Sequence, residues 1–206
     1  MKDQDVFELA LSKNENEFVK KALTNEFEVT VDIVQVLSAF PYVGSLVKLG
    51  VIGCKYMEFR FIRKLAKFLE SDLSIPYNEK ERFVNSLKDS DRKKIQDYVV
   101  QYLLHAEDDE KAVLMGYLYK SCVLDNIDKV MFLRLCSIID RSFVDDLRKL
   151  KEYINENDEY SVIANNFINL GLMDNYTGGF WKDKSTYQLN EVGKKLYEIL
   201  NENNWC

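Results

Sequence analysis

The fold is decided by the stretch Asp108-Asp-Glu-Lys-Ala-Val-Leu-Met-Gly-Tyr-Leu-Tyr-Lys-Ser-Cys-Val-Leu124. Its first three residues are acidic, and acidic side chains are favoured at the N-terminal end of a helix, where unpaired N–H groups point outward. The residues that follow are apolar nearly all round the helix, interrupted only by Lys120 and Ser121. A helix without a wide polar face lies inside a core. The sequence therefore predicts a central, buried helix over 111–124.

The residues after this stretch end the central helix and start another. Asp125 and Asn126 stop the apolar run, and Asp128 is placed to cap the next helix. We expect a mainly α fold, a helical bundle followed by a winged helix-turn-helix-like domain with one small β-hairpin. The predicted domains are a helical array over 1–127 and a winged-helix-like domain over 128–206, which packs on the central helix 111–124.

The composition limits the class of protein. The chain has 206 residues, of which 47% are hydrophobic and 13% aromatic, enough to bury a core and to exclude a disordered protein. Its formal net charge of −6 argues against a surface built throughout for nucleic acid. Only two prolines occur, Pro41 and Pro76, which leaves little room for linkers or for a loop-rich β-sandwich.

The four cysteines include no Cys-x-x-Cys pair. Cys122 and Cys136 lie among apolar residues at helical spacing, which is typical of free thiols in a reducing cytoplasm. Residues 1–8 are mostly polar and acidic and lack the apolar region of a secretory leader. We therefore expect a cytoplasmic protein.

The segment Val29–Cys54 is apolar and holds three of the eight glycines. A membrane-spanning helix needs about 20 predominantly apolar residues. Asp32 and Lys48 interrupt this segment, and Pro41 disfavours helix in the residue before it. We expect a buried helical hairpin here, and a membrane-active segment is the alternative.

Residues 56–70 form one amphipathic helix in the sequence pattern. On a helical wheel of about 100° per residue, four cations gather along one stripe, which we call the basic face. The basic face consists of Arg60, Arg63, Lys64 and Lys67. A basic amphipathic helix can lie on an anionic membrane or bind an acidic partner, so the basic face is a candidate binding surface and leaves peripheral membrane contact open. The alternative is a core helix with a solvated polar side.

The elements after the central helix follow the winged helix-turn-helix plan of three helices, a hairpin and a closing helix. Helices are expected over 129–140, 143–154 and 160–170, strands at 172–174 and 186–189, and a last helix capped by Asn190. The runs Leu170-Gly-Leu-Met173 and Tyr187-Gln-Leu-Asn-Glu-Val-Gly-Lys-Lys-Leu196 resemble the wing and closing helix of many bacterial winged-helix proteins. This resemblance covers the last third of the chain.

Short runs elsewhere resemble a group of bacterial and phage helical proteins that have no function attached. The runs are Phe40-Pro-Tyr-Val-Gly-Ser-Leu-Val-Lys48, Lys67-Phe-Leu-Glu70, Lys111-Ala112 and Phe132-Leu-Arg-Leu135. The resemblance implies a bacterial or phage origin and carries over no catalytic residue.

The charge pattern of the last third argues against DNA as the partner. A winged helix that reads DNA inserts its third helix into the major groove and holds the flanking phosphates with Lys and Arg. Here the third helix, within Ser161–Leu170, has asparagines but no positive charge, and no Lys or Arg occurs anywhere from 152 to 181. Phosphate neutralisation supplies most of the non-specific affinity for DNA. A winged-helix transcription regulator is therefore only an alternative function.

The predicted wing carries two aromatic residues, Phe180 and Trp181, beside two glycines. Exposed aromatic residues at a loop tip are typical of protein contacts, because they anchor binding hot spots. The alternative is that both rings fold back onto the core. We take Phe180 and Trp181 as candidate partner-binding residues.

No catalytic or metal-binding signature occurs in the sequence. The chain lacks Gly-x-Ser-x-Gly, His-Glu-x-x-His and Gly-x-x-x-x-Gly-Lys-Ser/Thr, and its single histidine, His105, has no cysteine nearby. We expect no catalytic residues, no metal site and no cofactor. The favoured function is a protein-interaction or regulatory module that binds another protein or forms a homo-oligomer. A membrane-active effector using residues 29–70 is an alternative.

Overall fold

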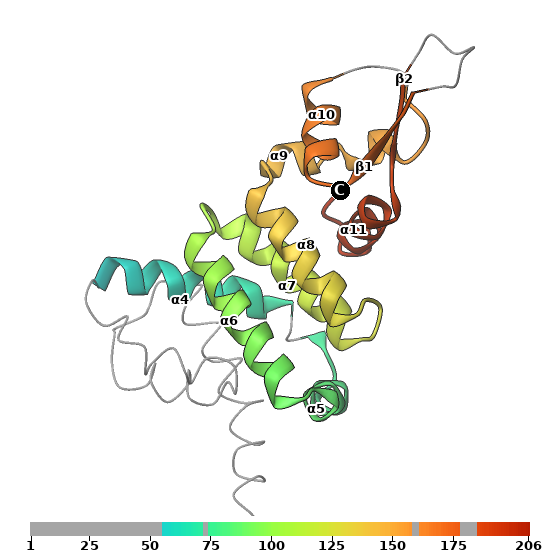
Figure 1. Cartoon of the computed structure of the whole chain (residues 1–206). Helices are drawn as coiled ribbons and strands as arrows, with labels where there is room; N and C mark the ends of the chain where they lie inside the picture. Colours follow the sequence, from blue (N-terminus) through green and yellow to red (C-terminus); the bar gives the residue numbers. More distant parts are fainter. Residues whose placement is uncertain (1–54, 72–73, 158–160, 178–184) are drawn as a thin grey trace, which may run out of the picture. The chain divides into compact units, whose positions relative to one another are not determined.

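The computed structural model describes residues 55–71, 74–157, 161–177 and 185–206 (Figure 1). The predicted hairpin Val29–Cys54 and the wing residues Phe180 and Trp181 lie outside these ranges. The chain divides into two compact units, Met1–Leu133 and Arg134–Cys206. The division falls inside a helix, whereas the sequence suggested a boundary before that helix, between 127 and 128.

The described residues are mostly helical and contain one two-stranded antiparallel sheet, as the sequence predicted. The first unit contains α4 (Lys55–Glu70), α5 (Tyr77–Ser86), α6 (Asp89–His105), α7 (Asp109–Val123) and the first residues of α8 (Lys129–Arg141). The second unit contains the rest of α8, then α9 (Val144–Leu147), the 3-10 helix η2 (Leu150–Tyr153), α10 (Val162–Asn169), β1 (Met173–Thr177), β2 (Ser185–Leu189) and α11 (Glu191–Glu202).

Helix α7 is the buried helix that the sequence predicted. It is preceded by Asp108, whose side chain accepts a hydrogen bond from the backbone N–H of Lys111 at 2.9 Å. Ten of the fifteen residues of α7 are buried, and Leu114 and Leu118 have no exposed surface. Helix α4 packs along α7 within the first unit (Figure 1). The predicted packing of 128–206 on this helix stays a prediction.

Two features of α7 make its packing close. At Gly116 the backbone of α7 approaches the backbone of α4, so that an added Cβ would overlap the carbonyl oxygen of Phe68. One turn further along, the ring of Tyr119 contacts three other rings. Its centroid lies 5.3 Å from that of Phe68, 6.0 Å from that of Phe83 and 6.1 Å from that of Phe132. These contacts join α4, α5 and the start of α8 around α7.

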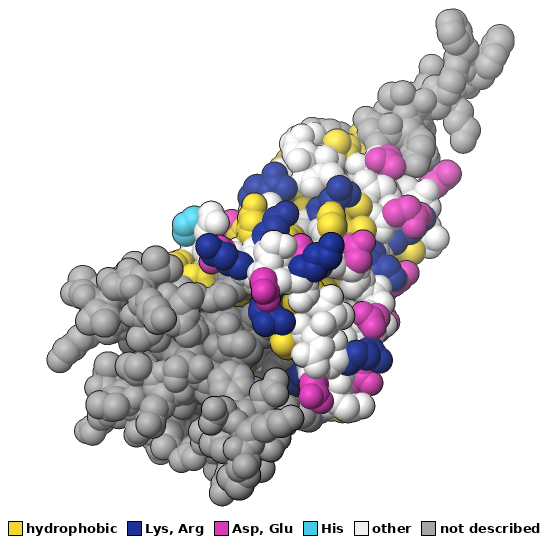
Figure 2. Space-filling model, turned by 60° about the horizontal axis from the view of Figure 1, so that its bottom comes forward, with side chains coloured by type: hydrophobic (Ala, Val, Ile, Leu, Met, Phe, Trp, Pro, Cys, Tyr) yellow, Lys and Arg dark blue, Asp and Glu magenta, His cyan; other side chains and the backbone are white. Residues whose placement is uncertain are grey.

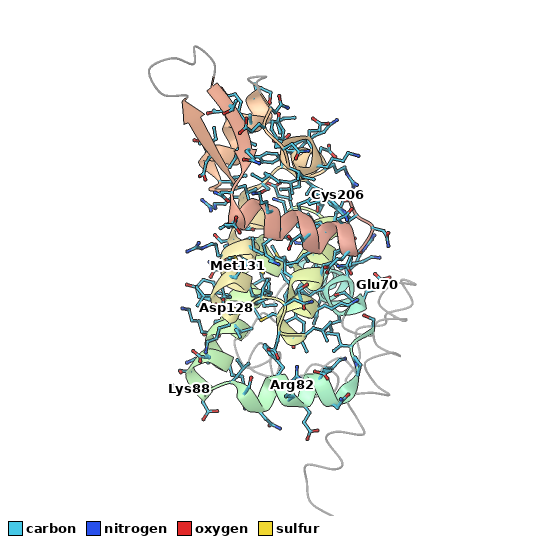
Figure 3. The ribbon with its side chains drawn as sticks, turned by 90° about the vertical axis from the view of Figure 1, so that its right-hand side faces the viewer. Glu70, Arg82, Lys88, Asp128, Met131 and Cys206 are labelled. Carbon is cyan, nitrogen blue, oxygen red and sulfur yellow. The ribbon has the colours of Figure 1, made fainter. Side chains whose placement is uncertain are left out.

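The connection between α7 and α8 forms as the sequence predicted. Helix α7 ends before Asp125, which takes a positive φ of 60°. The side chain of Asp128 then accepts a hydrogen bond from the backbone N–H of Met131 at 2.7 Å, at the start of α8 (Figure 3). This contact satisfies one of the unpaired N–H groups in the first turn of that helix.

In the second unit the hairpin and the last helix agree with the prediction. Strands β1 and β2 pair in the register Met173↔Leu189, and Asn157 forms a further antiparallel bridge to Tyr187 in β2. The side chain of Asn190 accepts hydrogen bonds from two N–H groups in the first turn of α11, both at 3.0 Å. In that turn Gly193 lies so close to the backbone of Leu172 that a Cβ would overlap its carbonyl oxygen.

The prediction of one continuous α-helix over 143–154 is wrong. The structure has the single turn α9 followed by the 3-10 helix η2. The buried residues of this segment are Val144, Leu147, Leu150 and Tyr153. They recur at every third position, and a 3-10 helix has three residues per turn, so this arrangement buries all four on one side. A regular α-helix would turn the fourth residue away from the first.

Candidate functional site

Helix α10, the third helix of the second unit, presents an uncharged outer side. Its N-terminus is capped by Ser161, whose hydroxyl accepts a hydrogen bond from the N–H of Ala164 at 3.0 Å. Ala164 and Phe167 are buried on the inner side. The outer side carries Val162, Asn165 and Asn169, all exposed. The helix therefore offers the solvent an apolar side chain and amides, with no charge of either sign.

A second exposed large apolar residue comes just before α9, which is hydrogen-bonded to this helix. Phe143, just before α9, is 66% exposed and Val162 is 71% exposed, the highest values among the large apolar side chains of the described residues. Helices α9 and α10 are joined by a hydrogen bond of 3.0 Å from the Asn166 amide to a carboxylate oxygen of Asp146. Phe143 precedes Asp146 by three residues at the N-terminal end of α9, and Val162 lies one helical turn before Asn166 in α10. We call Phe143, Asp146, Val162 and Asn166 the α9–α10 surface.

The stretch of chain that contains α10 is acidic, whereas the residues beside α9 carry charges of both signs. Glu152, Glu156 and Asp174 are exposed, and the chain has no Lys or Arg from 152 to 181. Four exposed cations precede this stretch: Arg141, Arg148, Lys149 and Lys151. Three of them contact other residues of the chain, and the Arg141 guanidinium donates a hydrogen bond to the carbonyl of Ser137. The Arg148 guanidinium lies 4.5 Å from the ring centroid of Trp205, and Lys149 pairs with Glu152 at 3.1 Å. On the α10 side, the lack of cations would suit a partner that is apolar and positively charged.

Phe143 and Val162 were not among the binding residues that the sequence indicated. The sequence pattern placed Phe143 inside a continuous helix over 143–154. In such a helix a further apolar residue is expected to belong to the buried side. The signal that could have found it is the three-residue spacing of 144, 147, 150 and 153, which excludes 143 from the buried set. Phe180 and Trp181, the residues that the sequence did indicate, lie outside the described residues.

The basic face of α4 makes contacts within the first unit. Arg60 donates a hydrogen bond to the backbone carbonyl of Glu107 at 3.2 Å, and the ammonium of Lys64 donates one to the carbonyl of Ala106. Arg63 pairs with the carboxylate of Asp109 at 2.5 Å. One turn further along α4, Lys67 pairs with Glu70 of the same helix at 3.2 Å. Two of the four predicted residues, Arg60 and Lys64, thus contact the α6–α7 connection, and Arg63 contacts the first residue of α7.

These contacts match the electrostatics of helix ends. The C-terminal end of α6 carries partial negative charge, and Lys64 and Arg60 bring cations to the carbonyls just beyond it. Lys64 is only 5% exposed, although the sequence pattern placed it on a polar stripe. Burial, followed by the neighbouring Arg60, lowers the pKa of the Lys64 ammonium. The basic face therefore includes one buried cation as well as exposed ones.

The remaining expectations concern metals and membranes. His105 is exposed at the end of α6, and the described residues contain no group of three or more His, Cys, Asp or Glu side chains placed to hold a metal ion. Within the same residues, no helix is both long enough and apolar enough to cross a membrane. Figure 2 shows positive and negative side chains interspersed over the coloured part of one face.

Comparisons with known protein families, curated proteins and solved structures give no match.

Proposed function

We propose that this chain is a non-enzymatic protein-interaction module whose second unit is a winged-helix-like domain. The order α8, α9 with η2, α10, hairpin and α11 supports the winged-helix interpretation. The bridge between Asn157 and Tyr187 adds a third backbone segment to the hairpin, which also fits a small winged sheet. A regulatory role, a cytoplasmic location and a bacterial or phage origin remain predictions from the sequence.

One observation carries the proposal. The α9–α10 surface combines the two most exposed large apolar side chains of the described residues with an uncharged third helix. Full burial of a Val or Phe side chain contributes about 1.5–3 kcal/mol, so covering this pair would add substantially to a binding free energy. The acidic stretch that contains α10 favours a partner segment with apolar residues and Lys or Arg. Steering by opposite charge would then set the orientation and the association rate.

The two alternatives have less support. A transcription regulator would need phosphate contacts from α10 or its surroundings, and α10 has no cation. A membrane-active effector would use residues 29–70, of which 29–54 lie outside the described residues. In the described part of that range, Arg60, Arg63 and Lys64 contact the chain itself.

The test is a quantitative capture experiment with the full-length chain as bait in extracts of its host. Phe143→Ser combined with Val162→Ser removes the apolar pair, and both residues are exposed, so folding should be unchanged. Val130→Ser is the matched control, because Val130 is 63% exposed but belongs to the first unit. We expect the double variant to weaken binding of the captured partner at least about tenfold, while the control retains it.

Two results would contradict the proposal. One is capture that the double variant leaves unchanged. The other is a nanomolar, sequence-specific complex with duplex DNA. Light scattering after size exclusion distinguishes self-association, which would appear as a dimer that the same double variant dissociates.

A further inference from the structure

A cavity of about 330 Å³ lies between α4 and the C-terminal end of α6. It belongs to the first unit and is independent of the α9–α10 surface. Four of the residues that line it are polar: Arg60, Lys64, His105 and Glu107. Pockets for small molecules have volumes of about 300–1,000 Å³, so the size suits a small organic ligand.

Lys64 is the central observation in this cavity. Its side chain is almost fully buried, yet among the described residues it has no carboxylate partner. An ammonium has three N–H donors, and the hydrogen bond to the carbonyl of Ala106 uses one of them. Buried cations in proteins are ordinarily paired with an anion. Among the described residues, Lys64 therefore has donors left over, and its positive charge is offset only at longer range, by Asp109 and Asp108.

A second cation lies one turn before Lys64 on α4. Arg60 is exposed, lines the same cavity and, within the described part of the chain, donates a hydrogen bond to the carbonyl of Glu107. A guanidinium has five N–H donors in a planar fork, which suits two-point contact with a carboxylate. The two cations together can hold an anion between them. An anion there would also offset both causes that lower the pKa of Lys64, its burial and the nearby Arg60.

The acidic residues near the cavity are directed to other partners. The carboxylate of Glu107 lies 3.8 Å from the ammonium of Lys111, and its side chain is 83% exposed. Asp109 pairs with Arg63, and the Asp108 side chain accepts a hydrogen bond from the backbone of Lys111. Among the described residues, none of these acids forms a direct ion pair with Arg60 or Lys64, and Asp109 and Asp108 act on the Lys64 charge only from a distance.

The rest of the lining is apolar. It consists of Phe61, Leu103, Leu104 and Ala106. Leu103 and Ala106 are buried, while Leu104 is 39% exposed at the rim. An inorganic anion would leave this apolar wall uncovered, whereas a ligand with an apolar body would bury it and gain binding free energy from the apolar surface removed from water.

We propose that the cavity binds a small organic carboxylate, with the carboxylate between Arg60 and Lys64 and an apolar body against Phe61, Leu103 and Leu104. The carboxylate accepts hydrogen bonds from both cations, and the apolar body lies toward the rim at Leu104. No residue of this site belongs to the α9–α10 surface, so the two proposals can fail separately.

The test uses octanoate as the probe, titrated into the full-length protein and followed by calorimetry or by backbone amide shifts of Leu103–Glu107. Octanol, which has the same chain without the charge, is the ligand control. Lys64→Met removes the buried charge and nearly keeps the side-chain volume. Lys67→Met is its matched control, because Lys67 lies one turn further along the same helix, pairs with Glu70 and does not line the cavity.

We expect saturable octanoate binding that Lys64→Met weakens at least about tenfold and Lys67→Met leaves unchanged. Octanol should bind far more weakly than octanoate. If Lys64→Met does not fold, Arg60→Gln answers the same question at an exposed position and should weaken octanoate binding several-fold. Absence of saturable binding would overturn the proposal, and so would binding that both Lys64→Met and Arg60→Gln leave unchanged.

Discussion

Gly116 of α7 lies directly against the backbone carbonyl of Phe68 in α4, with no room for a Cβ between the two helices. We predict that Gly116→Ala destabilises the protein by about 1–3 kcal/mol or more, because the clash is with backbone and the helices must move apart. The hydroxyl of Ser71, 2.6 Å from the added Cβ, adds to the overlap. Urea unfolding of the variant and the wild type measures the change.

The sign of this change in stability shows whether α4 and α7 are in close contact at Gly116. In a helix without tertiary contacts, Gly→Ala stabilises by about 1 kcal/mol through backbone entropy. A more stable Gly116→Ala variant would therefore show that α4 and α7 are further apart than described above.

A second prediction concerns the fully buried Leu118 of α7. Leu118→Ala should reduce the free energy of unfolding by about 2–5 kcal/mol, through lost burial and the cavity left behind. Lys88→Ala, at an exposed position, should change it by less than about 0.5 kcal/mol. Thermal or urea unfolding compares them, and similar losses for the two variants would contradict the burial of Leu118.

Hydrogen exchange on Leu118→Ala tests the prediction that 128–206 pack on the central helix. If they do, amides in 129–200 should lose protection together with those of the first unit. Full protection of 129–200 while the first unit opens would show that α7 serves one unit only.

A third prediction concerns pH. The hydrogen bond from Lys129 lowers the pKa of the Asp91 carboxyl below its ordinary value of 3.8. The folded state therefore binds this proton less readily than the unfolded state, so the ion pair stabilises the fold above about pH 4. The stabilisation is lost as the pH falls through the lowered pKa of Asp91. Asp91→Asn should therefore be less stable at pH 7 and lose less stability on acidification. Asp97→Asn, exposed on the same helix, should keep the wild-type acid dependence of the urea midpoint.

A fourth prediction concerns thiol reactivity. Burial raises the pKa of the Cys122 thiol to about 12, and only the thiolate reacts with alkylating reagents. At pH 8 in native buffer, Cys122 should resist iodoacetamide and become labelled only on unfolding. Cys206 is partly exposed, with a pKa raised to about 11, and should react first of the two. Peptide mass spectrometry gives both rates, and rapid native labelling of Cys122 would contradict its burial.

A fifth prediction concerns nucleic acid. Because α10 has no cation, duplex DNA should bind more weakly than about 10⁻⁶ M near physiological salt, as for non-specific contacts. Fluorescence anisotropy with mixed-sequence duplexes measures the affinity. A tight complex with one sequence would favour the transcription-regulator alternative.

The sequence predicted the fold best at helix ends that are capped by a nearby polar side chain and in the helix that is apolar on all sides. Asp128 and Asn190 cap helices as expected, because a short polar side chain before an apolar run has few other roles. Asp108, expected only as an acid at the start of α7, is the cap of that helix. The burial of α7 followed from the lack of a polar face. The division of 143–154 into α9 and η2 was missed because apolar composition was considered without its three-residue spacing.

The candidate sites were less predictable than the fold. The wheel placed Lys64 with three other cations, but its burial depends on the end of α6, more than forty residues away in sequence. The exposure of Phe143 and Val162 depends likewise on how α9 and α10 lie beside each other. Helical periodicity assigns a residue to a side of its own helix, and it carries no information about which distant segment covers that side.

The position of Trp205 under the Arg148 guanidinium gives the second unit its own optical signal. The chain has only two tryptophans, so Trp181→Phe leaves a single indole. Unfolding would separate this indole from the cation and transfer it to water, changing its emission. Fluorescence at that one residue would then follow the C-terminal end of the chain, while circular dichroism follows the helices of the whole protein. A difference between the two midpoints would measure how independently Arg134–Cys206 unfolds.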